Sequence, residues 1–250
     1  MSKIGLQLYS VKELTEKDFL GTLKKIGQLG FDGVEFAGYY NTAAREIKKL
    51  MDDYNIQAAG SHISIEALIN NFNQVVDFEK ELENPYVVVP YLAEEYRNSL
   101  DALKKTVDHL NEIGAKLKEN GMQLYYHNHG FEFEKIEGQY ILDHIVSATE
   151  AENLHVELDT YWVASMNLDP LDFIKKYGKR CSLLHIKDMK GKEDRSSTIV
   201  GKGIMDFASI TKAGKDLGTK WYTIEQEHFD GDQLDELGQG YLYLKDLLAK

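Results

Sequence analysis

The strongest constraint on the fold is a repeated alternation of short β-type runs with longer stretches whose apolar residues recur at helical spacing. IGLQLY, GVEFA, QAAGSHI and YVVVP precede stretches that predict helices over residues 16–29, 42–54, 65–82 and 99–120. QLYYHNH, LHVELD, SLLHIKD and YTIEQE each precede a further helical stretch. The chain therefore reads as eight strand-helix units.

These units predict an α/β protein with a closed parallel sheet. A (β/α)8 TIM barrel needs about 250 residues, which is the length of this chain. No Pro- or Ser-rich linker, charge block or low-complexity tract divides the sequence, so we expect a single domain over residues 1–250. A doubly wound open sheet is the alternative, but no GxGxxG or GxxxxGK[ST] phosphate loop follows the first strand.

The charge balance narrows the class of partner. A net charge of −12 argues against nucleic acid, because binding to a polyanion rests largely on Lys and Arg. A small polar substrate fits better. No run approaches membrane-spanning length, MSKIGLQLYS lacks the features of a signal peptide, and the single Cys181 lies in an apolar run. We therefore expect a cytoplasmic protein with no membrane partner, and a homo-oligomer is compatible with the sequence.

Strand parity separates each β-type run into two faces, because successive side chains of a strand point to opposite sides. One face is apolar, as with Leu6 and Leu8 or Val156 and Leu158, and would pack against outer helices. The other face is polar and would line the barrel interior, where unpaired charges are costly unless a cation or an ion pair compensates them. Its residues are Gln7, Glu35, His62, His127, His129, Glu157, Asp159, His185, Lys187, Glu225 and Glu227.

Asp159, His185 and Glu225 lie at the ends of three of these runs. Oxygen and imidazole ligands that converge from separate strand ends are typical of divalent-metal sites, and barrel active sites are built at the C-terminal mouth. Each residue also has an ordinary interpretation: Asp159 as a cap of the following turn, His185 as a hydrogen-bonded core histidine, and Glu225 as an ion-pair partner at the rim. Their shared inward face favours the metal site.

The run MQLYYHNH ends in His127 and His129, which point the same way and are candidate ligands or catalytic groups. A structural role for one of them is an equal alternative. Glu132 lies just past this strand, where it would either stay a loop acid or fold back into the mouth as a metal ligand.

A further set of residues is predicted to contact substrate. Lys187 shares the face of His185, and a lysine at a barrel mouth usually contacts an anion or a carbonyl. Trp162 belongs to an aromatic cluster past the strand ends that could wall a sugar-sized pocket, although loop packing would also account for it. The set is Gln7, Glu35, His62, Trp162, Lys187 and Glu227.

A series of short motifs covers nearly the whole chain: IGLQLYSVK, GFDGVEFAGYY, GSHIS, YYHNHGFEF, VELDTYWV, LLHIKD with GKGIMDF, and IEQE. Their order and spacing resemble the xylose isomerase-like TIM-barrel superfamily, in particular the sugar phosphate isomerase/epimerase group related to inosose dehydratase and tagatose epimerase. The resemblance implies a divalent metal held by Asp159, His185 and Glu225, commonly Mn²⁺, with Co²⁺, Fe²⁺, Mg²⁺ or Zn²⁺ as other candidates. The fourth ligand departs from the family, because epimerases carry a glutamate where this chain has His127; His127 or Glu132 would fill that place.

The resemblance further implies proton abstraction next to a carbonyl through a metal-stabilised enediolate, with Glu225, His127 or His129 as the base. We therefore expect a metal-dependent isomerase or epimerase that acts on a small sugar or keto-polyol. His127 in place of glutamate keeps a keto-sugar or inosose dehydratase as the alternative. A third hypothesis is a non-catalytic sugar-binding barrel whose interior is held by ion pairs such as Lys187 with Glu225.

Overall fold

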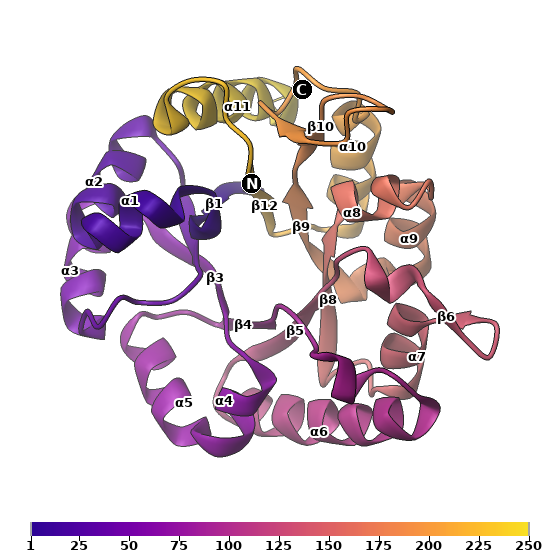
Figure 1. The fold of residues 1–250 in the computed structure, drawn as a ribbon. Helices are drawn as coiled ribbons and strands as arrows, with labels where there is room; N and C mark the ends of the chain where they lie inside the picture. Colours follow the sequence, from indigo (N-terminus) through magenta and orange to yellow (C-terminus); the bar gives the residue numbers. More distant parts are fainter. Residues whose placement is uncertain (1, 250) are drawn as a thin grey trace.

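The strands close into a parallel barrel in the computed structural model, which describes residues 2–249. Around the barrel the strand order is β1-β12-β9-β8-β5-β4-β3-β2, so each barrel strand pairs with the next one along the chain, and helices surround the strands as a ring (Figure 1). This confirms the predicted (β/α)8 TIM barrel. The barrel strands are β1 (Lys3–Gln7), β2 (Gly33–Phe36), β3 (Gln57–His62), β4 (Tyr86–Val89), β5 (Gln123–His127), β8 (Leu154–Asp159), β9 (Cys181–Ile186) and β12 (Trp221–Ile224).

The helices follow the predicted stretches, except that two of the stretches are each interrupted by a helix break. The stretch 16–29 is broken at Asp18, whose carboxylate accepts the backbone N–H of Gly21 at 2.9 Å and so caps a new helix. The stretch 65–82 is broken at Asn71. The α-helices are α1 (Lys12–Lys17), α2 (Phe19–Leu29), α3 (Ala44–Tyr54), α4 (Ile65–Asn70), α5 (Phe72–Glu81), α6 (Leu100–Glu119), α7 (Ile141–Ala148), α8 (Thr160–Ser165), α9 (Pro170–Tyr177), α10 (Phe207–Leu217) and α11 (Gln233–Leu248), and the 3-10 helices are η1 (Leu8–Val11), η2 (Glu94–Tyr96), η3 (Phe131–Phe133) and η4 (Gly178–Arg180).

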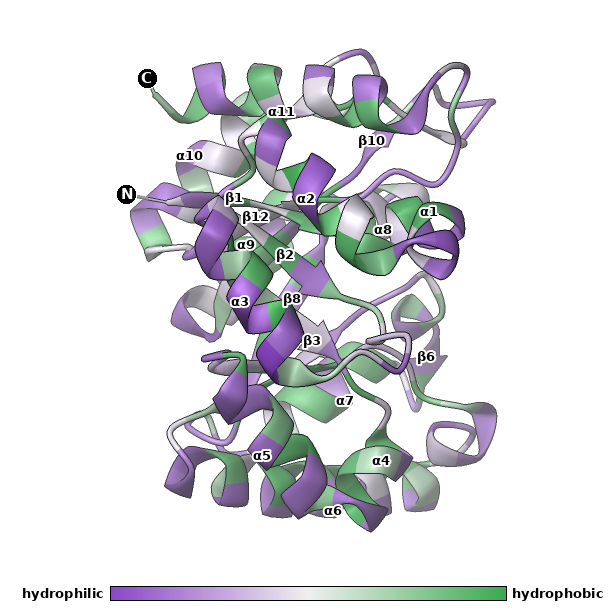
Figure 2. Ribbon diagram, turned by 90° about the vertical axis from the view of Figure 1, so that its left-hand side faces the viewer, coloured by the Kyte–Doolittle hydropathy of each residue, from purple (hydrophilic) through white to green (hydrophobic). Residues whose placement is uncertain are grey.

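Apolar side chains pack on both sides of the barrel wall. The outward face of the strands joins the helices in one large core, and the helices carry hydrophobic residues beside hydrophilic ones (Figure 2). Inside the barrel a second cluster fills the N-terminal half, so the polar interior predicted from parity is confined to the C-terminal half. This apolar plug consists of Ala59, Val88, Tyr125, Leu183 and Trp221.

Two short antiparallel hairpins lie outside the barrel: β6 (Lys135–Ile136) with β7 (Gln139–Tyr140), and β10 (Asp188–Met189) with β11 (Ser197–Thr198). The buried carboxylate of Asp188 accepts the backbone N–H groups of Gly201, Gly203 and Met205 at 2.9 to 3.1 Å, which fixes the loop that follows β9 and β10. None of the helices within residues 2–249 is both long and apolar enough to cross a membrane.

Gly114 in α6 and Gly238 in α11 should respond in opposite ways to replacement by alanine. A methyl group on Gly114 would overlap the backbone carbonyl oxygen of Asn153, whereas one on Gly238 would meet only Leu29 Cδ2 at 3.4 Å. We expect Gly114→Ala to lower the free energy of unfolding by about 1–3 kcal/mol and Gly238→Ala to raise it by up to about 1 kcal/mol. Urea unfolding measures both, and equal effects of the two substitutions would contradict the packing described.

Candidate metal centre

A layer of charged side chains lies directly above the apolar plug, at the C-terminal ends of the strands. Parity brings them inward: Glu157 and Asp159 are two residues apart on β8, and the register pairs Glu157 with His127 and Asp159 with His185. All are buried except His62, which is partly exposed. The layer consists of Gln7, Glu35, His62, His127, Glu157, Asp159, His185 and Glu225.

His127, Asp159, His185 and Glu225 form the upper group of this layer. Each offers one ligand atom, and these atoms all lie within 4.8 Å of one another. His185 Nδ1 is 2.9 Å from Glu225 Oε2 and 3.9 Å from Asp159 Oδ2. The three residues predicted from the ends of separate β-type runs are therefore brought together, and His127 is the fourth member.

The upper group fits a divalent cation. Asp159 Oδ1 accepts the backbone N–H of Trp162 at 3.1 Å, but the buried Asp159 Oδ2 has no hydrogen-bond partner among the described residues. A buried carboxylate oxygen without a partner is costly, and a cation would satisfy it. Two carboxylate oxygens and two imidazole nitrogens are a donor set that first-row divalent ions accept.

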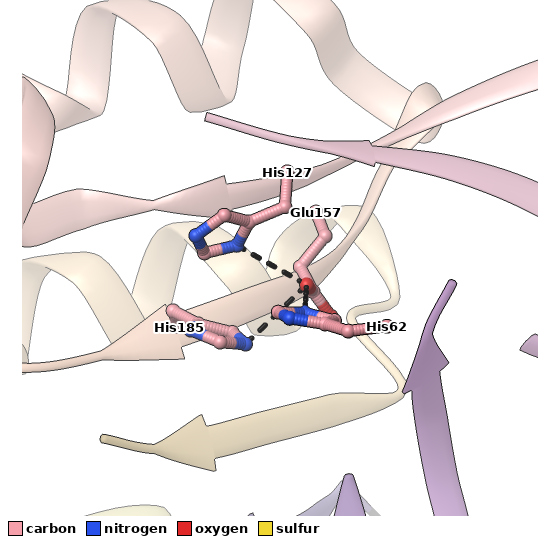
Figure 3. Close-up of side chains that lie close together, drawn as sticks. All are labelled: His62, His127, Glu157 and His185. Carbon is pink, nitrogen blue, oxygen red and sulfur yellow. Dashed lines mark hydrogen bonds and ion pairs between the residues drawn. The ribbon is translucent and has the colours of Figure 1, made fainter. Parts of the chain in front are cut away.

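Glu157 lies beneath the upper group at the centre of three imidazole rings (Figure 3). Its Oε2 is 3.1 Å from His62 Nε2, 3.2 Å from His127 Nδ1 and 3.3 Å from His185 Nε2. These residues form a second group whose ligand atoms lie within 4.8 Å of one another. Sequence reasoning placed Glu157 on the inward face without selecting it as a site residue, although its spacing of two residues from Asp159 was the available signal.

The electrostatics of the upper group depend on the balance between burial and nearby charge. Burial raises the pKa of Asp159 to about 7, with Lys187 acting against it. Burial also acts to raise the pKa of Glu225, but Lys187 and His185 outweigh it and leave that pKa well below its ordinary value. Burial acts to lower the pKa of His185, whereas carboxylates, first among them Glu157, raise it well above its ordinary value. Both raised pKa values favour the protonated forms of Asp159 and His185, which lowers the net negative charge of the layer.

The structure does not bring Glu132 into the metal group, contrary to its prediction as a ligand. Its Oε1 accepts the hydroxyl of Tyr126 at 2.7 Å, and its Oε2 accepts the backbone N–H of His129 at 2.7 Å. Tyr126 belongs to the outward face of β5, in the core shared with the helices. Glu132 therefore lies outside the barrel interior, where its hydrogen bonds hold the turn after β5. His127 is the residue that lies with the other three candidate ligands.

A cavity of about 520 Å³ opens above the upper group. His129 contributes to its wall, and burial lowers the pKa of this ring to about 4, so the imidazole is neutral. The cavity is lined by Gln7, Tyr9, Ala37, His62, Pro90, Tyr91, His127, His129, Trp162, Glu225 and Glu227.

Two predicted substrate-binding residues, Glu35 and Lys187, lie behind this lining. Glu35 Oε2 accepts from Gln7 Nε2 and from His185 Nε2, each at 2.6 Å. Lys187 is buried, pairs with Glu225 at 3.4 Å and with Glu227, and lies against the rings of Tyr161 and Trp162. Lys187 does not line the cavity itself, but it pairs with two glutamates that do.

Comparisons with known proteins agree with the fold. A model of the family described as Xylose isomerase-like TIM barrel matches residues 23–247. The crystal structure of a sugar phosphate isomerase/epimerase from Parabacteroides distasonis superimposes with a TM-score of 0.85 at 26% identity, covering 100% of this chain and 95% of that one.

An inosose dehydratase from Clostridium beijerinckii is 23% identical over 233 residues, which cover 79% of this chain and 78% of the relative. A structure of L-ribulose 3-epimerase shares the fold, with a TM-score of 0.75 at 16% identity over 100% of this chain and 95% of that one. The match of the family model extends over most of the chain. The chain therefore belongs to the xylose isomerase-like TIM barrel family.

Proposed function

We propose that the protein is a metal-dependent sugar isomerase or epimerase that removes a proton from the carbon next to a carbonyl. The observation that carries this proposal is the group of His127, Asp159, His185 and Glu225, two of which also line the cavity at the barrel mouth. Mn²⁺ is the proposed ion, since mixed carboxylate and imidazole ligands suit it. The resemblance to a sugar phosphate isomerase/epimerase supports the same reaction class.

A divalent cation at this position supplies electron withdrawal from a carbonyl oxygen, which makes the neighbouring C–H more acidic. Glu225 is the proposed proton acceptor, because it lines the cavity and its low pKa keeps the carboxylate ionised. His129 is the proposed second group, since its neutral ring lines the same cavity and follows β5, which β8 and β9 separate from β12. Proton removal by Glu225 on one side, and return on the other side of a solvent proton relayed by His129, would invert a carbon centre.

The proposed substrate is an unphosphorylated sugar or keto-polyol. None of the eleven residues that line the cavity is Lys or Arg, the two side chains that most often bind phosphate. Gln7, His62 and Glu227 supply hydrogen-bonding groups for hydroxyls, and the ring of Trp162 supplies a flat apolar face. This combination matches the mixed polarity of a sugar ring.

A dehydratase of a keto-sugar or inosose is the second candidate, and two observations favour it. His127, not a glutamate, lies in the metal group, and curated relatives are named inosose dehydratase. Burial acts to lower the pKa of His62, but Glu35 and Glu157 outweigh it and raise that pKa, which favours a proton on this ring at the cavity. Such a ring could protonate a departing hydroxyl.

Deuterium exchange tests the proposed reaction. The Mn²⁺-loaded protein, incubated in D₂O with ketoses and keto-polyols, should place deuterium on the carbon next to the carbonyl, as measured by mass spectrometry. Glu225→Gln should slow this exchange by about a hundredfold or more at saturating Mn²⁺, and the exposed control Glu95→Gln should not. A dione that absorbs in the near ultraviolet would identify the dehydratase instead. Absence of exchange from the whole panel by metal-loaded protein would sink both enzymes.

Metal binding tests the site itself. Mn²⁺ should raise the melting temperature of the unmodified protein, because a ligand that binds only the folded state stabilises it. Asp159→Asn and His185→Asn each remove one ligand, so the shift should largely disappear, while Glu132→Gln should keep it. A protein that binds no Mn²⁺, with no change in melting temperature, would favour the non-catalytic barrel held by the pair of Lys187 with Glu225.

The affinity for Mn²⁺ should fall as the pH falls. Asp159, whose pKa is about 7, and His185, whose pKa is raised, carry protons that the cation must displace. Each displaced proton weakens binding about tenfold per pH unit below the pKa, so binding should be stronger at about pH 8 than at about pH 6. Titration followed by electron paramagnetic resonance measures it, and a pH-independent affinity would contradict the assigned ligands.

A further inference from the structure

Glu157 contacts three imidazole rings and does not line the cavity. The side chain is fully buried. Its Oε2 lies within 3.3 Å of a nitrogen on each of the three rings (Figure 3).

Glu35 lies beside Glu157 and is itself held in place. Gln7 Nε2 donates to Glu35 Oε2 at 2.6 Å, and Gln7 Oε1 accepts the backbone N–H of Tyr9 at 3.0 Å. His185 Nε2 lies 2.6 Å from the same oxygen of Glu35. A chain of hydrogen bonds thus links the start of η1 to the ring of His185.

These contacts assign opposite tautomers to the two imidazoles of the upper group. His127 contacts Glu157 through Nδ1, so this nitrogen carries the proton and Nε2 is left as the free donor atom. His185 contacts Glu35 and Glu157 through Nε2, which leaves Nδ1 free to bind a cation in place of its present contact with Glu225; Nδ1 lies 2.9 Å from Glu225 Oε2 and 3.9 Å from Asp159 Oδ2.

We propose that Glu157 and Glu35 are positioning residues, which hold His127 as the Nδ1–H tautomer and His185 as the Nε2–H tautomer so that both free nitrogens face the cation. This inference rests on the cation site of the proposed function. Carboxylates that accept the second ring N–H of a histidine ligand orient the ring and raise its affinity for the ion. Glu157 contacts the rings of His127 and His185, and Glu35 contacts the ring of His185, so the two buried carboxylates together orient both histidine ligands.

The same contacts argue against a second ion in the lower group. A cation among His62, His127, Glu157 and His185 would need the ring nitrogens that already lie at hydrogen-bond distance from Glu157. We therefore expect one Mn²⁺ per chain, and two would contradict the proposal.

Substitution by the matched amide provides the test. Glu157→Gln and Glu35→Gln keep the size of the side chain, but place an N–H₂ group where the rings need an acceptor. Each should weaken Mn²⁺ binding by about tenfold to a hundredfold, as measured by electron paramagnetic resonance. The control is Glu79→Gln, since Glu79 is also fully buried but accepts from Tyr39, Ser61 and Asn84 on the other side of β3. It should leave the affinity unchanged.

The tautomers of the His127 and His185 rings provide a second measurement, which would not change if Glu157 and Glu35 only stabilised the fold. In Zn²⁺-loaded protein, ¹H–¹⁵N spectra should show the proton on Nδ1 of His127 and on Nε2 of His185. Identical tautomers, or unchanged Mn²⁺ affinity in Glu157→Gln, would overturn the proposal, as would an equal loss in Glu79→Gln. If Glu157→Gln does not fold, the Mn²⁺ affinity of Glu35→Gln and the spectra of the unmodified protein test the proposal. Failure of the unmodified protein to bind any ion would instead remove the proposed function, and this inference with it.

Discussion

The structure depends on compensating the charge of four carboxylates buried at one end of a barrel. Glu35, Glu157, Asp159 and Glu225 lie within a single layer, and an unpaired buried ion is costly by several kcal/mol. In the described residues, part of that charge is offset by imidazole protons and by Lys187. The unpartnered Asp159 Oδ2 shows that the offset is incomplete. In the proposed site a divalent cation would complete it at the C-terminal mouth of the barrel, so the same ion would serve both the fold and the proposed reaction.

The rest of the barrel supports this layer. The apolar plug that includes Tyr125, Leu183 and Trp221 closes the barrel beneath it, so the charged groups face low-dielectric packing below and the cavity above. Within the layer, the carboxylates divide into two roles by depth. Glu225 lines the cavity and Asp159 lies with it in the upper group, whereas Glu35 and Glu157 lie outside the cavity lining and contact the histidine rings. One layer can thus hold an ion and orient the groups that hold it.

The alternation of side chains along strands and the apolar spacing of about 3.6 residues along helices were enough to predict the barrel, its inward face and the convergence of Asp159, His185 and Glu225. They could not predict contacts that depend on distances across the barrel. Glu157 was on the predicted face, but its position among three rings depends on strands that are far apart in the chain. Glu132 was misplaced because its direction depends on the hydroxyl of Tyr126, a partner on the outer face. The helix break at Asp18 depends on a side-chain cap that apolar spacing does not register, whereas at Asn71 the backbone leaves the helical conformation without such a cap.

The central claim is that one divalent cation binds between β5, β8, β9 and β12, and anomalous diffraction from crystals grown with Mn²⁺ tests it most directly. Data collected on both sides of the manganese absorption edge should give one strong peak per chain, in contact with His127, Asp159, His185 and Glu225. Glu157 and Glu35 should lie below the peak and outside the coordination shell. Absence of a peak, or a peak bound by Glu132 in place of His127, would contradict the account.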